Sequence, residues 1–190
     1  MNAGVAGVDD RGPHWVNRVL ITGASGSGTT TLGAALAKKF DAVFIDADDF
    51  LWLPTRPPYT EKRPAAERLA LILGELQRHE RAVVAGSVMG WGTELETAFD
   101  LVVFLFVETS IRLQRLAHRD LERHGTVNPE FIAWAAQYDQ GPSAGRSLAR
   151  HTAWLESLNC QVVRLDGDLA VAERLDRLAP HLRGPSRRSA

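Results

Sequence analysis

One segment near the start of the chain reads Val19-Leu-Ile-Thr-Gly-Ala-Ser-Gly-Ser-Gly28-Thr-Thr-Thr-Leu-Gly-Ala-Ala-Leu-Ala37. Its first part is a β-branched apolar run, its middle is rich in glycine, and its last part consists of good helix formers. This order predicts a strand, a phosphate-binding loop and a helix. A flexible Gly/Ser turn is the alternative, but a plain linker would not stand between a strand and an amphipathic helix.

The glycines explain how such a loop binds phosphate. Without a Cβ, Gly23, Gly26 and Gly28 can adopt positive φ and let the backbone approach an anion closely. The helix that follows adds its unpaired N–H groups and its positive dipole end. We therefore expect nucleotide phosphates to bind a segment that we name the phosphate loop, made of Gly23, Ala24, Ser25, Gly26, Ser27, Gly28, Thr29, Thr30 and Thr31.

One residue of the phosphate loop departs from the usual pattern, because Thr29 stands where a Lys normally follows the last glycine. A unit charge ~4 Å from a phosphate oxygen is worth roughly 4 kcal/mol at an effective dielectric of about 20. Lys38 and Lys39 lie roughly 14 Å further along the helix axis, at about 1.5 Å per residue, so they cannot replace it. The missing charge must come from another part of the fold.

Composition limits the possible classes of protein. At 190 residues with 45% hydrophobic content, the chain is long enough for one domain with a full core. Its formal net charge of −1 gives no field that favours nucleic acid or an anionic membrane, so we expect neither as a partner. We also expect no membrane span and no secretory signal, a cytoplasmic location, and a monomer or weak homodimer. The single Cys160 cannot form an internal disulfide, and we expect it to be a core thiol.

Strands and helices are predicted to alternate along the chain, which indicates an α/β protein. The expected fold is a three-layer, doubly wound, five-stranded parallel sheet. Expected strands are 18–22, 42–45, 82–85, 101–107 and 161–165, and expected helices are 30–40, 64–79, 110–123, 129–140, 145–158 and 170–182. Residues 18–182 form the predicted domain, between a flexible leader at 1–17 and a disordered tail at 183–190. Ligands of such sheets bind beyond the carboxyl ends of the strands.

A group of carboxylates follows the second predicted strand in the sequence Asp46-Ala-Asp48-Asp49. If the chain stays extended there, Asp46 and Asp48 point to the same side. With Thr30, whose hydroxyl stands at the usual magnesium position, Asp46 is a candidate metal ligand, and Asp48 is a candidate proton acceptor and acceptor-binding residue. A loop that merely caps the next helix is the alternative.

Residues 46–80 form the expected acceptor-binding segment. Here prolines and aromatic residues alternate with bases, so Arg63 and Arg68 are candidate clamps for an anionic acceptor, and Trp52 or Tyr59 could stack on a flat one. After the third strand, Gly86 would let a ligand approach the backbone and Trp91 would form a flat wall. A solvated connection and a plain turn, respectively, are the alternatives.

Four arginines at 112, 115, 119 and 123 are spaced by 3, 4 and 4 residues, which places them on one helix face. A solvated basic face is the ordinary interpretation. Because this helix leads into an expected lid at about 124–145, these residues and Arg146, expected on the next helix with Arg150, are also candidates for the missing charge. Arg119 and Arg146 are the first choices as catalytic residues.

Together these features resemble the nucleoside monophosphate kinase family, in the adenylate kinase and shikimate kinase-like branch of P-loop proteins. The resemblance lies in the phosphate loop, Asp46 and Asp48, the glycines after the third strand, Arg115 and Arg119 before a lid, Arg146 after it, and Asp166-Gly167 at the last strand. It implies a P-loop NTPase fold, an ATP and Mg²⁺ site to which Arg115 and Asp166 contribute, and transfer of a phosphoryl group to a small acceptor.

The identity of that acceptor stays open in the sequence. The Asp-Gly-Phe-Pro-Arg stretch that adenylate kinases have after the third strand is replaced by Gly86-Ser-Val-Met-Gly-Trp91. A nucleoside monophosphate is the first candidate and a shikimate-like hydroxy acid the second. A GTPase is disfavoured because Asn-Lys-x-Asp is absent, and an AAA-type motor because the chain is short and Glu108 is a single carboxylate. A regulatory module that binds nucleotide without transferring phosphate is the remaining rival.

Overall fold

The computed structural model describes residues 16–56, 58–141 and 146–182. Nearly all of the predicted leader, the whole predicted tail and residues 142–145 of the predicted lid therefore lie outside the described residues. Within the described ranges, no helix is long and apolar enough to cross a membrane.

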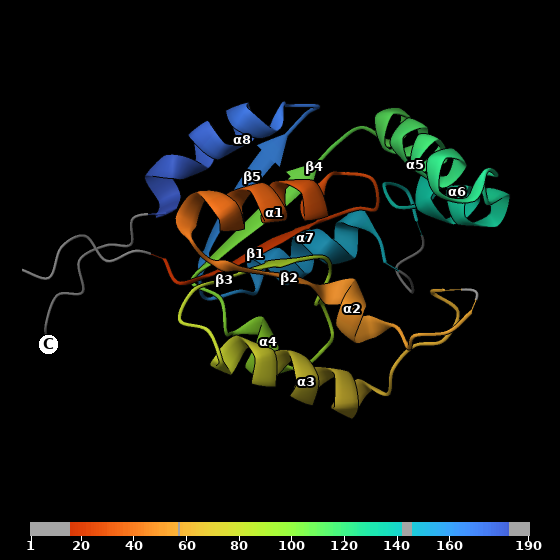
Figure 1. Ribbon diagram of the computed structural model, residues 1–190. Helices are drawn as coiled ribbons and strands as arrows, with labels where there is room; N and C mark the ends of the chain where they lie inside the picture. The colour runs from red at the N-terminus through yellow and green to blue at the C-terminus, as the bar shows by residue number, and fades with distance from the viewer. Residues whose placement is uncertain (1–15, 57, 142–145, 183–190) are drawn as a thin grey trace, which may run out of the picture.

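Five parallel strands form one sheet in the order β2-β3-β1-β4-β5 (Figure 1). They are β1 Arg18–Gly23, β2 Val43–Asp46, β3 Ala82–Ala85, β4 Leu101–Phe106 and β5 Gln161–Asp166. Each strand lies within one residue of its predicted bounds, and the predicted fold class is confirmed. The strand β1 is central, so the phosphate loop leaves the middle of the sheet at its carboxyl end.

Helices cover both faces of the sheet (Figure 1). They are α1 Thr29–Phe40, α2 Ala47–Leu51, α3 Ala65–Gln77, α4 Thr93–Glu96, α5 Thr109–His124, α6 Pro129–Ala136, α7 Leu148–Glu156 and α8 Val171–Leu178, followed by the 3₁₀ turn η1 Ala179–Leu182. Helices α1 and α8 pack on one face, and α3, α4 and α7 pack on the other. Helices α5 and α6 extend beyond the carboxyl ends of the strands.

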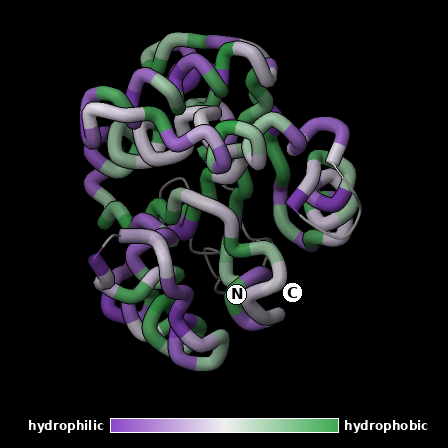
Figure 2. Tube along the Cα trace, turned by 90° about the vertical axis from the view of Figure 1, so that its right-hand side faces the viewer, coloured by the Kyte–Doolittle hydropathy of each residue, from purple (hydrophilic) through white to green (hydrophobic). Residues whose placement is uncertain are grey.

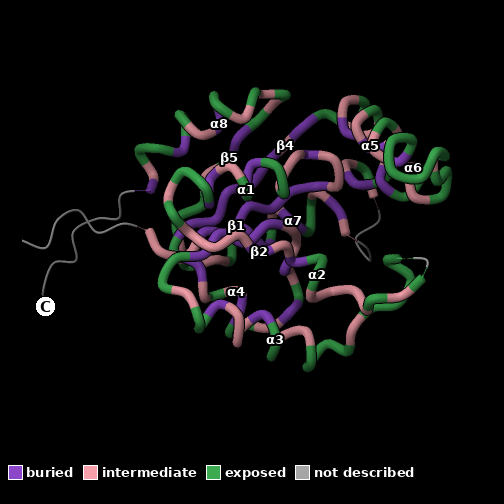
Figure 3. The backbone as a smooth tube through the Cα atoms, viewed as in Figure 1, coloured by how far each residue is buried: buried purple, intermediate pink, exposed green. Residues whose placement is uncertain are grey.

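The strand β4 shows why the sheet is buried on both sides. Its side chains alternate, so that Val102 and Phe104 join the core under α3, α4 and α7, whereas Val103 and Leu105 join the core under α1 and α8. Each fully buried side chain of this size contributes roughly 1.5–3 kcal/mol. The central strands β1, β3 and β4 are accordingly hydrophobic and buried (Figures 2 and 3), whereas most residues of the edge strand β5 are exposed. Cys160 is half-buried at the edge of the first core, and this burial raises the pKa of its thiol.

Two expectations about the segments after β2 and after the lid were wrong. The Asp46–Asp49 stretch is not extended, because the Asp46 side chain accepts a hydrogen bond from the Asp48 N–H at 3.0 Å and thereby caps the short helix α2. Arg146 does not share a helix with Arg150, because the Ser147 hydroxyl caps α7 and the helix begins at Leu148.

Smaller differences concern the other helices. The predicted helix 129–140 ends at Ala136, and the predicted helix 170–182 divides into α8 and η1. Pro64 stands before the first turn of α3 rather than in it, whereas Pro129 opens α6 as expected. Asn128 caps α6 through a hydrogen bond from the Phe131 N–H at 3.1 Å.

Candidate active site

The phosphate loop joins β1 to α1 and packs closely against β4 and α5. Gly26 has a φ of 83°, and a Cβ there would lie 2.7 Å from the carbonyl oxygen of Arg112. Any other residue would be strained and would collide with the backbone of α5. Gly28 is the N-cap of α1 and no side chain caps this helix, so the first N–H groups of α1 keep their capacity to bind an anion.

Thr30 and Asp46 meet at the carboxyl edge of the sheet. The Thr30 hydroxyl donates to Oδ2 of Asp46 at 3.3 Å, while Oδ1 of the same carboxylate caps α2. Both are hard oxygen donors of the kind that Mg²⁺ prefers, and Mg²⁺ commonly takes only one or two protein ligands beside phosphates and water. No cluster of three or more metal-binding side chains occurs in the described part of the chain, so a cation here would need those further ligands.

Asp48 lies on α2, one residue beyond the start of the helix, and its side chain keeps contact with solvent. Desolvation by the surrounding protein and the negative charge of Asp46 nevertheless raise the pKa of Asp48. The positive charge of Arg146 and a hydrogen bond from the Trp52 side chain act in the opposite direction. Asp48 is therefore within electrostatic reach of Arg146.

Four guanidinium groups contact carbonyl oxygens of the phosphate loop, and one of them, that of Arg112, is described below. Arg146 donates to Gly23 at 2.5 Å, Arg115 to Gly26 at 3.3 Å, and Arg174 to Ser27 at 3.0 Å. Burial lowers the pKa of both Arg146 and Arg174, and the Nε of each is buried without a hydrogen-bond partner. Positive charge thus surrounds the loop although Thr29 brings none.

Of the other arginines of α5, Arg123 is exposed, as on an ordinary solvated face, whereas Arg112 and Arg119 contact other parts of the protein. Arg112 is 1% exposed and lies inside the protein. Arg119 contacts Asp120 at 3.3 Å and lies 5.7 Å from the Phe131 ring, so its described contacts are with α5 and α6 rather than with the phosphate loop. A catalytic role for Arg119 stays a prediction that would require movement of its side chain.

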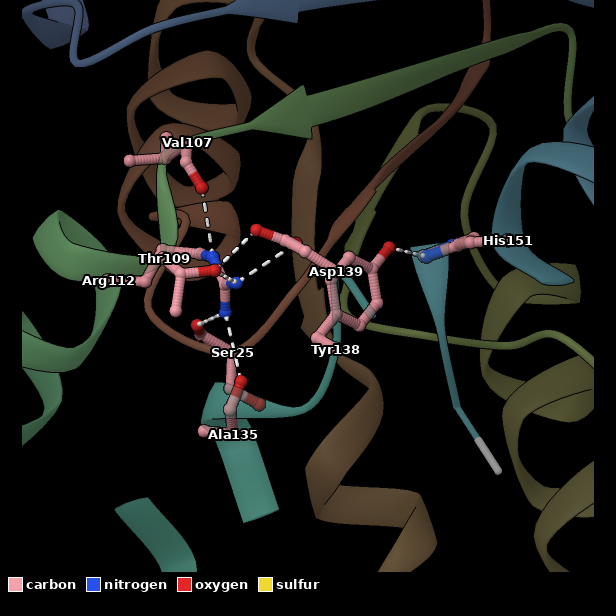
Figure 4. Close-up of polar contacts among 8 residues, drawn as sticks. All are labelled: Ser25, Val107, Thr109, Arg112, Ala135, Tyr138, Asp139 and His151. Atoms are coloured by element: carbon pink, nitrogen blue, oxygen red, sulfur yellow. Dashed lines mark hydrogen bonds and ion pairs between the residues drawn. The ribbon is translucent and has the colours of Figure 1, made fainter. Parts of the chain in front are cut away.

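The buried guanidinium of Arg112 connects four parts of the site (Figure 4). Its Nε donates to Val107 at the end of β4, and its Nη1 donates to Ser25 of the phosphate loop and Ala135 of α6. Its Nη2 binds Thr109 at 2.7 Å and the Asp139 carboxylate at 3.1 Å. All three nitrogens of the guanidinium therefore donate hydrogen bonds, as a buried charge requires.

A second buried network begins beside the first (Figure 4). The His151 ring on α7 bonds the Thr22 hydroxyl at 3.1 Å and the Tyr138 hydroxyl at 2.8 Å. Burial, reinforced by the charge of Arg146, lowers the pKa of His151 to about 3, and burial raises the pKa of Tyr138 to about 12. Both side chains are therefore neutral near neutral pH, and they link the segment after α6 to the residue before the phosphate loop.

The predicted acceptor-binding residues are placed in different ways. Arg68 lies 4.8 Å over the ring of Trp91, and Trp91 itself is only 7% exposed, so it supports Arg68 rather than offering an open face. Arg63 is already engaged, since it donates to the Phe50 carbonyl at 3.2 Å and to Glu67 at 2.6 Å. A Cβ on Gly86 would lie 2.9 Å from Ala47, so this glycine lets α2 approach β3.

Several site residues were missed in the sequence. Arg174 and Asp168 follow the last strand, where we expected only Asp166 to contribute, yet Asp168 pairs with Arg115 while Asp166 pairs with Arg164 of β5. The residues Tyr138, Asp139 and His151 also carried no local motif. Their partners lie far away along the chain, so only the folded structure brings them together.

The comparisons with known proteins agree with this geometry. The model of the AAA domain family matches residues 19–130, which is more than half of the chain. The uncharacterized protein YqaC of Bacillus subtilis is 40% identical over 172 residues, which cover 85% of this chain and 95% of that protein. A cytidylate kinase of Archaeoglobus fulgidus is 29% identical over 114 residues, or 54% of this chain and 62% of that enzyme.

Solved structures support the same fold. The shikimate kinase of Bacteroides thetaiotaomicron superposes with a TM-score of 0.54 over 88% of this chain and 98% of its own, at 20% identity. Fold, phosphate loop and relatives define the class of protein, which is a P-loop kinase of the small-molecule type. The chain belongs to the AAA domain family, and it is similar to nucleotide kinases and other small-molecule kinases. The match concerns the domain and does not by itself imply a motor activity.

The buried His151 should make stability depend on pH. Its pKa is about 3 in the folded protein and near 6.5 when exposed, so below about pH 6.5 only the unfolded chain takes up the proton. We therefore expect the free energy of unfolding to fall with pH in this range, by up to about 1.4 kcal/mol per pH unit. Urea unfolding between pH 8 and pH 4 measures this slope.

Two variants separate this effect from general acid sensitivity. His151→Gln should flatten the slope, whereas His118→Gln, which changes a side chain that is 75% exposed, should leave it unchanged. Equal slopes in all three proteins would contradict the assignment. If His151→Gln does not fold, NMR of the parent protein provides the test. The chemical shift of the His151 Hε1 proton should stay constant down to pH 4.

Proposed function

We propose that the protein transfers the γ-phosphate of ATP to a small anionic acceptor, with a nucleoside monophosphate as the first candidate. The observation that carries the proposal is the position of Arg146. Its guanidinium contacts Gly23 of the phosphate loop and acts electrostatically on Asp48, so it lies near both the site expected for the phosphates and the candidate proton acceptor.

In this proposal each residue has a stated role. The N–H groups of the phosphate loop and of the first turn of α1 bind the phosphates, and Arg146 neutralises charge that develops during transfer. Thr30 and Asp46 would hold Mg²⁺, which supplies further neutralisation of the phosphate oxygens. The acceptor oxygen bonds to the γ-phosphorus and ADP leaves. Where the acceptor is a hydroxyl group, its proton passes to Asp48, whose raised pKa suits this role, whereas a phosphate oxygen of a nucleoside monophosphate attacks largely deprotonated.

The charge of the acceptor is inferred from Arg68. Its guanidinium is held over Trp91, and its Nε is buried without a hydrogen-bond partner, so an anionic group of the acceptor would complete its bonding. The similarity to a cytidylate kinase favours a nucleoside monophosphate. A small hydroxy acid is the second candidate, because the Asp46-x-Asp48 pattern and the fold also match shikimate kinase-like proteins. The cytoplasmic location and the monomeric or weakly dimeric state stay predictions.

Removal of the Thr30 hydroxyl tests the metal site. Thr30→Val should weaken ATP binding in the presence of Mg²⁺ by roughly one hydrogen bond to a charged group, ~1.5–3 kcal/mol, and should change binding without Mg²⁺ much less. Thr30→Ser keeps the hydroxyl and should bind nearly as the parent does. Calorimetric titration with and without Mg²⁺ measures this difference, and an equal loss under both conditions would count against a metal ligand at Thr30.

Arg146 should contribute more to transfer than to ATP affinity. Arg146→Ala leaves the developing charge without its counter-charge, so we expect the rate of phosphoryl transfer to fall by on the order of 10²-fold or more. The matched control is Arg78→Ala on α3, whose side chain is 74% exposed and pairs only with Glu75 in the described contacts, and this variant should behave as the parent. Parent-like turnover in Arg146→Ala would exclude the role.

The reaction itself is tested with a panel of acceptors. Nucleoside monophosphates and small hydroxy acids are each added to protein with ATP and Mg²⁺, and acceptor-stimulated release of ADP is measured. We expect stimulation by at least one member, and Asp48→Asn should depress that stimulated rate far more than ATP affinity, because transfer depends on positioning and proton removal. If no acceptor exceeds the background with water, the regulatory module becomes the better interpretation.

A further inference from the structure

Trp134 is an exposed aromatic residue beside the phosphate loop. Its side chain on α6 is 47% exposed, whereas Trp91 and Trp154 are 7% and 8% exposed. The exposed surface of α6 lies at the end of the molecule toward which the strands point (Figure 3). A small pocket opens at this place, and its lining consists of Ser25, Trp134, Ala135, Tyr138 and Arg146.

Contacts to the backbone beside Trp134 and to its indole ring hold this residue in place. The carbonyl of the next residue, Ala135, accepts a hydrogen bond from the buried Arg112 at 3.4 Å, and Arg112 also binds Ser25 of the phosphate loop. Phe131 stacks against Trp134 with ring centroids 5.8 Å apart and planes inclined by 23°. Arg119 covers Phe131 in turn. An aromatic side chain fixed in this way binds a ligand at little entropic cost.

The same pocket is bordered by a cation. Arg146 lines it, and its guanidinium carries the positive charge nearest to Trp134 in that lining. An anionic group would be attracted to this charge, while a flat ring beside that group would cover the indole. An open-chain hydroxy acid would be attracted to Arg146 but would leave most of the indole exposed to water.

We propose that Trp134 forms the ring-binding wall of the acceptor site and selects acceptors that carry a ring next to an anionic group. The inference rests on the proposed function, because it assigns a specificity-determining residue to the acceptor of that reaction. It also moves the aromatic wall from Trp91, where the sequence predicted it, to the opposite side of the site.

Binding can be observed without measuring activity. The full chain contains five Trp residues, so labelling with 5-fluorotryptophan gives five ¹⁹F resonances, and the Trp134→Phe variant identifies the one from Trp134. The probes are cytidine monophosphate, adenosine monophosphate and shikimate as ring-bearing anions, gluconate as an open-chain anion, and inorganic phosphate, each added in the presence of ADP. We expect a saturable shift of the Trp134 resonance with a ring-bearing anion, and no shift with gluconate, phosphate or ADP alone.

Kinetics provide the second measurement for any acceptor that stimulates ADP release. Trp134→Ala should raise the KM for that acceptor about tenfold or more, since loss of a base–aromatic stack is typically of this size, and Trp134→Phe should restore most of the affinity. The matched control is Leu121→Ala on α5, which removes another exposed apolar side chain, 51% exposed, and should leave the KM unchanged.

The outcomes separate this inference from the proposed function. If an acceptor stimulates ADP release but neither shifts the Trp134 resonance nor depends on Trp134 for its KM, the inference is overturned and the function stands. If ring-bearing anions shift the resonance but none is phosphorylated, the inference stands and the function fails. A resonance that responds to ADP alone, or to no probe, overturns the inference.

Discussion

The hydrogen bonds of the buried Arg112 guanidinium hold together the end of the protein that carries the phosphate loop, α5 and α6. Desolvating a charge costs several kcal/mol, and the cost is offset only because Val107, Ser25, Ala135, Thr109 and Asp139 accept its hydrogen bonds. Val107 directly follows β4, and the other acceptors lie in the phosphate loop, α6, α5 and the segment after α6. One side chain therefore sets the distance between the phosphate loop and the helices that extend beyond the sheet.

The charge around the phosphate loop is distributed in an unusual way. A loop with its own Lys carries its cation on the helix that follows, whereas here Arg115, Arg146 and Arg174 reach the loop from α5, from the segment before α7 and from α8. Arg174 lies 147 residues from its partner Ser27. The electrostatic character of the loop is thus a property of the complete fold rather than of its local sequence.

The sequence was informative where short-range rules decide the structure. Apolar runs bounded by glycine or carboxylates located every strand, and because β1, β3 and β2 are parallel neighbours, Thr30 and Asp46 could be expected to meet. Periodicity could not tell that Arg112 is buried, because Arg112 and Arg115 look equivalent on α5 until Asp139 is placed. Composition also could not show that Trp91 is buried and Trp134 is exposed. The exposure of each Trp depends on which other elements of the fold pack against it. Helix capping by the Asp46–Asp49 stretch was the alternative to the metal-binding interpretation of the sequence, and the structure contains this cap.

The two oxygens of Asp46 divide two tasks between them. Oδ1 begins α2, and Oδ2 accepts from Thr30 at the place proposed for the cation. Any ligand that draws the carboxylate toward itself therefore pulls on the first turn of the helix that carries Asp48. A ligand at Thr30 and Asp46 would in this way act directly on Asp48, the group that we propose faces the acceptor, over a distance of only two residues and without movement of the sheet.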